Sequence, residues 1–462
     1  MTLPHNWTIT TFDTILNYEQ PTAYIVKSTE YSDAYKTAVL TAGKSFIIGY
    51  TNESKGIYSE NLPVIIFDDF TSATQYVTFP FKVKSSAMKI LQPINDQLNK
   101  KYIYYFMQTI KHNVTTHKRY WISDYSKREI PIPPLSEQHR IVAKIDSFFS
   151  ELDNGVALLK NIKAQLAIYR QAVLKLAFEG KLTIKWRKIN VVEVNKIVIK
   201  NIMTTRKMEN CKDKYKDIDP EFSLYDLPKE WKWVSIGYIS KGVEYGTSAK
   251  SNKNGKVVVL RMGNIQNGTF VYDDLAYTSN KKEIEKYKLN ENDVLFNRTN
   301  SPELVGKTAI YTGSVPSIFA GYLIRLNQIS YIDAKYLTYY LNSPHSKKCG
   351  KIAKTDGVNQ SNINGTKLST YPFPLCSKPE QLAIVSAIEY RLSVCDKLEQ
   401  TIDDTLALSA SLRQSILKKA FEGQLVPQDP NDEPAEKLLE RIKAEKAAVL
   451  AKQKRTRKRG RK

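Results

Sequence analysis

Cysteine and histidine, the residues from which most disulfide and zinc frameworks are built, are scarce in this sequence. Its 462 residues include four cysteines and five histidines. No two of the cysteines (Cys211, Cys349, Cys376 and Cys395) lie within four residues of each other, so neither a disulfide framework nor a Cys-x-x-Cys zinc half-site is expected. The histidines show no ligand spacing either. We therefore expect no metal site and a reducing compartment, the cytoplasm being the simplest.

Long apolar runs are also lacking. A transmembrane helix needs about 18 consecutive apolar residues, whereas residues 62–67 and 257–260 are typical of the longest runs here. The start of the chain, Met1-Thr2-Leu3-Pro4-His5, has neither the basic nor the apolar region of a signal peptide. We expect neither a membrane span nor secretion.

Catalytic motifs are the third absence. Residues 42–45, Ala-Gly-Lys-Ser, resemble the end of a P-loop, but Ala38 stands where the first glycine is required. We find no Gly-x-Gly-x-x-Gly loop, no Gly-x-Ser-x-Gly turn and no Asn/Asp-Pro-Pro-Tyr/Phe motif of an amino-methyltransferase. Asp68 and Asp69 end an apolar run without a second acidic partner, which favours strand-end capping or a base contact over metal catalysis. We expect no catalytic residues.

Positive charge is abundant. The chain has 69 Lys and Arg against 47 Asp and Glu, a net charge of +22, which favours nucleic acid over a membrane surface or an acidic protein as partner. Residues 452–462 carry eight of these cations in eleven positions, so this tail either binds phosphate nonspecifically or is a solvated end. The remaining excess belongs to the body of the chain.

The sequence repeats itself. Residues 137–145, Glu-Gln-x-x-Ile-Val-x-x-Ile, recur at 380–388, and Ala-Phe-Glu-Gly at 177–180 recurs at 420–423. Both offsets are 243, and 18 of the 46 positions from 137 to 182 are identical in the second copy. This is a duplicated element.

Each copy predicts one long helix of about 43 residues, or about 65 Å. Prolines precede each copy, and Gly180 and Gly423 stand where a helix C′ glycine would. Apolar residues recur at alternating steps of three and four, as in a coiled-coil seam, so we expect the copies to pair; periodicity leaves their direction open. The predicted seam consists of Ile141, Ile145, Leu152, Leu159, Leu166, Val173, Ile384, Ile388, Leu398, Ile402, Leu412 and Ile416.

The rest of the chain predicts two mixed α/β domains. Residues 1–135 and 227–378 have short apolar runs broken by Gly, Asn, Asp and Ser, and both begin with Leu-Pro-x-x-Trp, at Leu3 and Leu227. The predicted organisation is therefore domain 1 (1–135), a long helix (136–183), a charged connector (184–226), domain 2 (227–378), a second long helix (379–426) and a basic tail (427–462). The fold class is α/β, mixed α+β, with an internal repeat.

Polar loops in both domains supply candidate nucleic-acid contacts. Asn, Gln and Arg pair with base edges, while Ser, Thr and Lys contact phosphates, although Asn, Gly and Thr are also ordinary turn residues. The candidates are Lys44, Ser45, Tyr50, Thr51, Thr74, Gln75, Lys118 and Arg119 in the first domain, and Tyr245, Thr247, Ser248, Lys250, Arg261, Asn264, Gln266, Asn297, Arg298, Thr299, Asn300, Lys307, Asn359 and Gln360 in the second.

Together these motifs resemble the specificity subunit of a type I restriction–modification enzyme, over nearly the whole chain. The resemblance rests on the Leu-Pro-x-x-Trp starts, on residues 293–307 (Asp-Val-Leu-Phe-Asn-Arg-Thr-Asn-Ser-Pro-Glu-Leu-Val-Gly-Lys), and on the duplicated helix motifs. It implies that each domain is a target-recognition domain that reads one half of a bipartite double-stranded DNA site. It also implies that the helices form an antiparallel coiled coil that docks two methyltransferase subunits.

The resemblance further implies no catalysis and no bound cofactor in this chain. Methyltransferase subunits would use S-adenosylmethionine, and motor/endonuclease restriction subunits would use ATP and Mg. The first domain matches the 293–307 segment poorly, and the proline segment before the second helix is two residues longer than that before the first. Two alternatives stay open: a specificity subunit serving a fused nuclease–methyltransferase, and a two-headed coiled-coil adaptor for RNA or protein.

Overall fold

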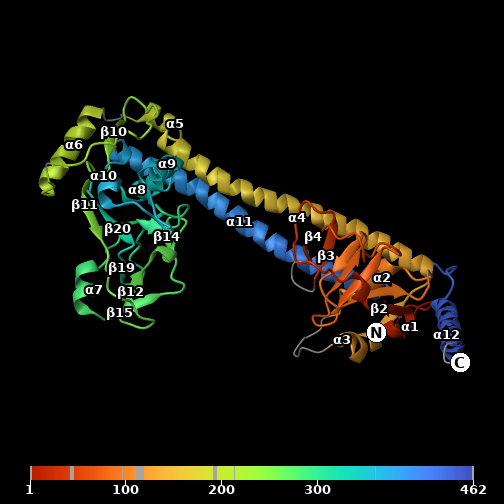
Figure 1. The fold of residues 1–462 in the computed structure, drawn as a ribbon. Helices are drawn as coiled ribbons and strands as arrows, with labels where there is room; N and C mark the ends of the chain where they lie inside the picture. Colours follow the sequence, from red (N-terminus) through yellow and green to blue (C-terminus); the bar gives the residue numbers. More distant parts are fainter. Residues whose placement is uncertain are drawn as a thin grey trace. The chain divides into compact units, whose positions relative to one another are not determined.

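The computed structural model of the chain describes residues 3–41, 46–95, 97–110, 119–190, 195–212, 214–358 and 360–459. The chain divides into two compact units (Figure 1). Unit 1 consists of Met1–Leu159 and Asp403–Lys462, and unit 2 of Lys160–Ile402. Two long helices, α4 (Leu135–Phe178) and α11 (Lys378–Phe421), each contribute residues to both units. The two units are treated separately below.

Unit 1 contains a mixed α/β domain built on two small sheets. The antiparallel sheet has the order β2-β8-β5-β6, and its middle strand β5 is buried along its whole length because its sequence is almost entirely apolar. The second sheet, β4-β3-β7, pairs β3 with β7 in parallel. The elements are β1 (Thr8–Thr11), α1 (Phe12–Ile15), β2 (Leu16–Glu19), η1 (Pro21–Tyr24), β3 (Thr37–Leu40), β4 (Ile47–Thr51), β5 (Val64–Asp68), β6 (Thr74–Val77), β7 (Phe81–Val83), β8 (Met88–Pro93), α2 (Lys100–Met107), α3 (Tyr120–Ser123), η2 (Tyr125–Lys127), β9 (Glu129–Ile132) and α12 (Ala435–Arg459).

Unit 2 contains a second mixed domain, whose largest sheet is antiparallel with the order β11-β20-β16-β18. The other elements of the domain surround this sheet, and a strand pair, β10 with β23, corresponds to β1 with β9 of unit 1. The elements are α5 (Ile184–Ile189), α6 (Asn195–Met208), β10 (Lys232–Ser235), β11 (Ser240–Tyr245), β12 (Val257–Leu260), η3 (Met262–Asn264), β13 (Ile265–Gln266), β14 (Thr269–Phe270), β15 (Ala276–Thr278), α7 (Lys281–Tyr287), β16 (Val294–Asn297), β17 (Thr299–Asn300), β18 (Thr308–Ile310), β19 (Ser317–Phe319), β20 (Leu323–Gln328), α8 (Ala334–Leu341), α9 (Pro344–Ala353), β21 (Thr355–Asp356), β22 (Ser361–Asn362), α10 (Gly365–Ser369) and β23 (Pro372–Leu375).

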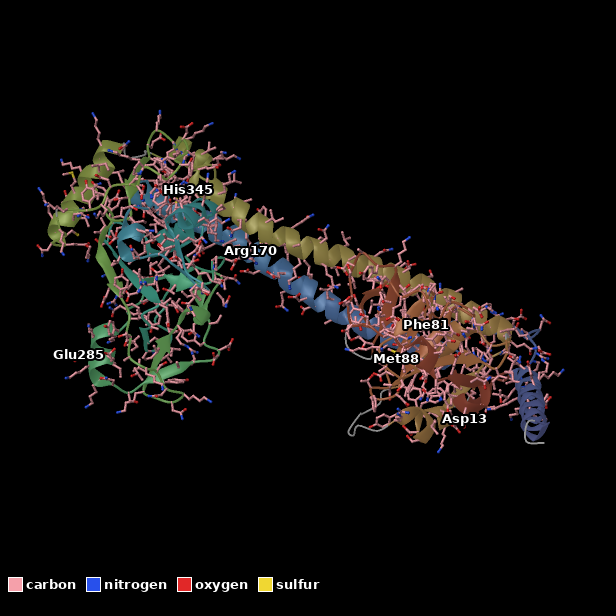
Figure 2. All side chains as sticks on the ribbon, viewed as in Figure 1. Asp13, Phe81, Met88, Arg170, Glu285 and His345 are labelled. Atoms are coloured by element: carbon pink, nitrogen blue, oxygen red, sulfur yellow. The ribbon has the colours of Figure 1, made fainter. Side chains whose placement is uncertain are left out.

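The long helices pair with each other in an antiparallel direction. In unit 1 the first half of α4 contacts the second half of α11, where Asp153 forms an ion pair with Arg413. In unit 2 the second half of α4 contacts the first half of α11, where Arg170 lies 2.6 Å from Asp396 (Figure 2). Adding the repeat offset of 243 to Asp153 and Arg170 gives Asp396 and Arg413, so the two ion pairs are equivalent in the two copies of the repeat. The predicted pairing of the two long helices is confirmed. Their antiparallel direction is the one expected when a two-fold axis relates the two copies.

The seam between the helices differs from the predicted one at two positions. Leu398 and Leu412 were expected inside it but are 47% and 46% exposed, whereas Cys395 is 1% exposed. The reason is that charged residues occupy seam positions: Lys163 and Arg170 of α4 both pair with Glu399 of α11. An apolar pattern cannot reveal such positions, so the prediction took the neighbouring leucines. Of the other predicted residues, Ile141, Ile145, Val173, Ile384, Ile388, Ile402 and Ile416 are buried, and Leu152, Leu159 and Leu166 are partly buried.

A buried tryptophan–carboxylate hydrogen bond fixes each domain to the start of the helix that follows it. Trp7 Nε1 donates to Glu137 Oε2 at 3.0 Å in unit 1, and Trp231 Nε1 donates to Glu380 Oε2 at 2.9 Å in unit 2. These are the Trp of each Leu-Pro-x-x-Trp start and the Glu of each Glu-Gln motif. A buried charged acceptor of this kind is costly to leave unpaired, so the bond fixes the fit between domain and helix.

The glutamine next to each of these carboxylates adds two further bonds. Gln138 Nε2 donates to the Pro133 carbonyl, and its Oε1 accepts from the Asn99 backbone N–H at the start of α2. Gln381 makes the same pair of bonds to Cys376 and Asp333, the latter at the start of α8. The duplicated sequence is therefore a duplicated set of contacts.

The C-terminal ends of the two long helices have the same backbone conformation. Gly180 and Gly423 have φ values of +70° and +72°, as predicted for C′ glycines. A Cβ at either position would lie within 2.5 Å of a proline of the nearby domain start, Pro228 or Pro4. Glycine is therefore required both for the left-handed backbone and for the close approach.

The connector and the tail are more structured than their composition suggests. In residues 184–226, helix α6 buries Val198 and Ile202 in the core of unit 2. In residues 427–462, helix α12 buries Leu438 and Ile442 in the core of unit 1. Within the described part of the chain, no helix combines the length and the apolar composition needed to cross a bilayer.

Unit 1 lacks one partner that unit 2 has. Glu380 also accepts from Thr183 and from Arg187, whose Nη1 lies 2.5 Å from Oε1. The corresponding oxygen of Glu137 is buried without a hydrogen-bond partner among the residues that the structure describes, and burial raises the pKa of this carboxyl above its usual value. An acid with a raised folded-state pKa contributes most stability below its unfolded-state pKa, and this stability is lost as pH rises through the folded-state value.

We therefore expect Glu137→Gln to become more favourable, relative to wild type, as pH rises from about 4 to 8, because the wild-type free energy of unfolding falls as this buried carboxyl ionises, whereas the amide does not titrate. Urea titrations at the two pH values measure this difference. The matched variant Glu380→Gln should lower the free energy of unfolding of the protein at pH 8 by about 2 kcal/mol, because Arg187 loses a charged partner. A Glu137→Gln effect that does not vary with pH would contradict this account.

Candidate nucleic-acid interface

The predicted segment 293–307 forms the centre of a polar surface in unit 2. It supplies β16 and β17, and Arg298 lies between these strands with its guanidinium 4.8 Å from the ring centre of Tyr245. Arg298 Nη2 also contacts Asn362 Oδ1 at 3.4 Å. The stacked guanidinium is held in place by a ring and an amide rather than by a carboxylate. Its charge therefore remains available to a ligand.

A small three-stranded sheet supports this arginine. In the order β17-β22-β21, Thr299 pairs with Asn362 and Asn300 with Ser361, and Asn362 Nδ2 donates to Thr299 Oγ1 at 2.7 Å. The turn between β21 and β22 exposes Val358 and Gln360. Main-chain bonds extend beyond the strands, because the Arg298 carbonyl accepts from the Ile363 N–H at 2.9 Å and the Gln360 carbonyl accepts from the Gly357 N–H at 2.8 Å. Arg298, Asn300 and Gln360 therefore lie on or beside one small sheet.

Two polar groups in this segment have no hydrogen-bond partner among the described residues. The Asn297 side chain is fully buried, and neither its Oδ1 nor its Nδ2 is bonded; the same holds for Arg298 Nε. Unpaired buried polar atoms are rare in folded proteins and concentrate at functional sites. Their position at the end of β16 supports the assignment of this loop as the recognition site of unit 2.

The structure places the other unit 2 candidates in two groups. Thr247 and Asn264 are buried: Thr247 bonds to Glu283, and Asn264 bonds to main-chain groups including the Arg261 N–H and the Val271 carbonyl. Their polar atoms serve the fold, which corrects the expectation of a direct ligand contact. The partly or fully exposed candidates are Tyr245, Ser248, Lys250, Arg261, Gln266, Asn300, Lys307 and Gln360; Arg261 pairs with Asp274, and Thr299 is nearly buried. Asn359 lies outside the described residues.

The candidates of unit 1 form no comparable cluster in the described part of the chain. Gln75 and Arg119 are exposed and Tyr50 is partly exposed. Thr51 and Thr74 are buried, and Thr74 accepts a bond from Gln108, so the predicted ligand contact is corrected for both. Lys44, Ser45 and Lys118 lie outside the described residues.

The acidic pair of unit 1 acts as a strand-end cap. Asp68 Oδ1 accepts from the Phe70 N–H at 2.9 Å, and Asp69 Oδ1 accepts from the Trp121 N–H at 2.8 Å. Asp69 also forms a fully buried ion pair with Lys89 at 3.2 Å. This is the capping role that the sequence favoured. No cluster of three or more potential metal ligands occurs among the described positions.

Sequence reasoning missed Tyr322. Its ring is half exposed, and its carbonyl accepts from the Arg298 N–H at 3.0 Å, which places it beside the recognition loop. Tyr322 follows Gly321 in a turn between β19 and β20, where nothing in the local sequence distinguishes it from the other 27 tyrosines. Only the fold brings it to this site.

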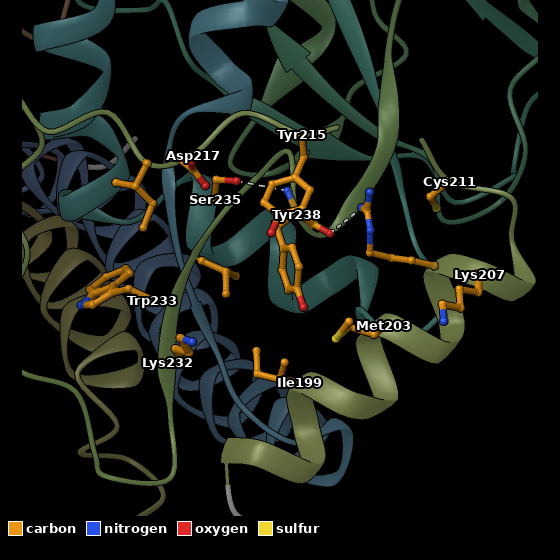
Figure 3. A pocket seen from close by; sticks show the side chains of 13 residues that line it. Ile199, Met203, Lys207, Cys211, Tyr215, Asp217, Lys232, Trp233, Ser235 and Tyr238 are labelled. Atoms are coloured by element: carbon orange, nitrogen blue, oxygen red, sulfur yellow. Dashed lines mark hydrogen bonds between the residues drawn. The ribbon is translucent and has the colours of Figure 1, made fainter. Parts of the chain in front are cut away.

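A pocket of about 630 Å³ lies elsewhere in unit 2, lined by α6, β10 and the segment between them (Figure 3). Its one arginine, Arg206, donates to the carbonyls of Tyr238 and Lys212 and stacks on the rings of Tyr215 and Tyr238. That cation is therefore used within the fold. None of the predicted contacts lines this pocket, so we do not assign it to the recognition site.

Each unit contains a mixed domain fixed to the start of a long helix, and unit 2 presents a partly exposed arginine in a chain with a net charge of +22, which suits a polyanionic ligand. The sequence matches the family described as type I restriction modification DNA specificity domain twice, over residues 4–167 and 228–408. The chain therefore belongs to this family. Each match covers one domain and the first part of the long helix that follows it.

Individual relatives cover most of the chain. It is 30% identical to the EcoR124I/EcoR124II specificity subunit of Escherichia coli, over 87% of this chain and 89% of that one. It is 26% identical to the EcoBI specificity subunit of Escherichia coli, over 97% and 94%. A solved chain from work on assembly and conformational transition of the type I R-M system superposes with a TM-score of 0.61 at 17% identity, over 92% of this chain and all of that one. The HsdS subunit of Thermoanaerobacter tengcongensis superposes with a TM-score of 0.50 at 17% identity, over 92% and 98%.

The role of Arg298 is open to a direct test. If its guanidinium reads a base, Arg298→Ala should weaken binding by about 1–3 kcal/mol and relax one position of the DNA site. The control is Lys250→Ala, which removes an exposed cation of the same unit and should weaken binding to all sequences equally. Binding of a randomised duplex pool followed by sequencing distinguishes the two. An equal loss of affinity for all sequences would show that Arg298 contacts phosphate. A lowered melting temperature of the variant would show that Arg298 supports its loop.

Proposed function

We propose that this protein is the specificity subunit of a type I restriction–modification complex and binds double-stranded DNA in a sequence-specific manner. Each unit would read one half of a bipartite site, and the long helices would recruit the methyltransferase subunits. The observation that carries this proposal is the double family match, because each matched region contains one mixed domain, the Trp–Glu bond that fixes it, and most of the helix that follows.

The chemistry of the chain supports this assignment. The net charge of +22 supplies sequence-independent attraction to phosphate, which accounts for affinity but not for choice of site. Base discrimination requires planar polar groups that the main chain holds in place. Arg298 just before β17, Asn300 on β17 and Gln360 in the β21–β22 turn would supply them. We propose that the exposed candidates of unit 1, Gln75 and Arg119, and the partly exposed Tyr50 play the corresponding role in that unit.

The same proposal covers partners and catalysis. The chain would be non-catalytic and would act in the cytoplasm with two methyltransferase subunits, which use S-adenosylmethionine, and with restriction subunits, which use ATP and Mg. The specificity-subunit names of its relatives support such a division of labour. A fused nuclease–methyltransferase would be an alternative partner, which the neighbouring genes decide.

The helix pair would set the distance between the two half-sites. We expect that duplicating residues 160–163 in α4 and residues 400–403 in α11 lengthens the preferred spacer by one or two base pairs and leaves both half-sites unchanged. Four residues add about 6 Å and about 40° of rotation, and antiparallel helices tolerate such an insertion when both receive it. Methylation mapping measures the spacer.

The control for this experiment is the insertion in α4 alone. It should destabilise the protein, because it moves Arg170 and its neighbours out of register with α11. A doubly extended protein with an unchanged spacer would show that the helices do not act as a ruler.

The adaptor alternative predicts a different ligand preference. For the specificity subunit we expect duplex DNA to outcompete single-stranded RNA of equal length at 150 mM salt, with a steep dependence of log K on log salt from several phosphate contacts. Competition titrations at several salt concentrations measure both quantities. Equal competition by RNA would favour a general nucleic-acid adaptor.

A further inference from the structure

An open groove of about 620 Å³ lies in unit 1, at the end of α11 and beside the strand pair β1–β9. It is mainly apolar, and Ile9 of β1 is 49% exposed at its edge. The lining residues that the repeat places in unit 2 as well are Ile9, Pro131, Gln414, Lys418, Phe421 and Glu422. Nothing in the proposed DNA-reading role accounts for a groove with this composition.

The internal repeat identifies the corresponding place in unit 2. The offset of 243 relates Gln414, Lys418, Phe421 and Glu422 to identical residues at 171, 175, 178 and 179. The Lys418–Glu422 and Lys175–Glu179 ion pairs have the same separation of 3.9 Å. Strand register relates Ile9 to Trp233, since both lie opposite equivalent prolines, Pro131 and Pro374.

In unit 2 a segment of the connector fills this place. Tyr225 donates its hydroxyl to the Phe178 carbonyl at 3.0 Å, and its ring packs edge-on against Trp233 at 4.9 Å. Trp233 Nε1 in turn donates to the Tyr225 carbonyl at 3.0 Å. His345, labelled in Figure 2, packs on the same tyrosine ring and contacts the Ser223 carbonyl. In unit 2, the place that corresponds to the groove thus holds a segment of this chain through its tyrosine.

Unit 1 retains the acceptor of this tyrosine hydrogen bond. The carbonyl equivalent to that of Phe178 belongs to Phe421, in the last turn of α11, where helix carbonyls lack an intrahelical donor. The offset of 224 between the domain starts relates Tyr225 to residue 1, a methionine, which has neither ring nor hydroxyl and lies outside the described residues. The tyrosine must therefore come from elsewhere.

We propose that this groove docks an extended, tyrosine-bearing segment of a partner protein, with the tyrosine hydroxyl donating to the Phe421 carbonyl. A second copy of this chain is a poorer donor, because its own residues 222–225 are engaged in its unit 2. The proposal rests on the proposed function only in assuming that the chain works with partner subunits.

The probe is the capped peptide Glu-Phe-Ser-Leu-Tyr-Asp, the sequence of residues 221–226, titrated onto the full-length protein with saturation-transfer NMR. We expect binding in the millimolar range, weakened about fivefold when the tyrosine is replaced by phenylalanine. Ile9→Trp should tighten binding about tenfold, because it recreates the indole donor of Trp233. Ile9→Glu should abolish binding without affecting folding, since this side chain is half exposed.

The control variant is Leu158→Glu, which places the same charge at another exposed apolar position of unit 1 and should leave peptide binding unchanged. Duplex DNA binding by Ile9→Glu should equal that of wild type, which separates this test from a failure of the proposed function. The absence of binding to wild type and Ile9→Trp at about 5 mM peptide would overturn the proposal. Binding that Ile9→Glu leaves intact would overturn it equally.

Discussion

The buried bond from a domain's first tryptophan to the first-turn glutamate of a long helix is the interaction on which the rest of the structure depends. It occurs as Trp7–Glu137 and as Trp231–Glu380, between residues 130 and 149 positions apart. The neighbouring Gln138 and Gln381 tie the same helix start to α2 and α8. Each domain is therefore fixed to a rigid helix end, and loops such as that of Arg298 are presented from a defined base.

Much of this architecture follows from the sequence because the repeat is gapless. The two helices, their C′ glycines and the two domain starts all come from motifs that occur twice. The seam was predicted less well, since Glu399 and Arg413 lie between the helices next to Leu398 and Leu412, the residues that the apolar period selects. Periodicity records hydrophobicity only, and it cannot identify charges that pair across the helices.

The recognition site was predicted by composition rather than by geometry. Arg298 and Asn300 are partly exposed on or beside a small sheet, whereas Asn264 and Thr247, from similar polar loops, are used within the fold. Amide and hydroxyl side chains that cap a turn and those that read a base have the same local sequence signature. The contacts of Tyr322, like the Trp–Glu bonds, join segments that no local pattern connects. The two units also differ where their sequences differ, as Arg187 and Tyr225 of unit 2 show.

The central claim is that this chain directs methylation to a site of two separate halves, one read by each unit. Long-read methylation mapping of DNA from cells that carry the whole operon tests it most directly, compared with cells from which only this chain is deleted. The account predicts one bipartite motif with a fixed spacer, present with the chain and lost without it. A single continuous motif, or methylation that persists in the deletion, would contradict it.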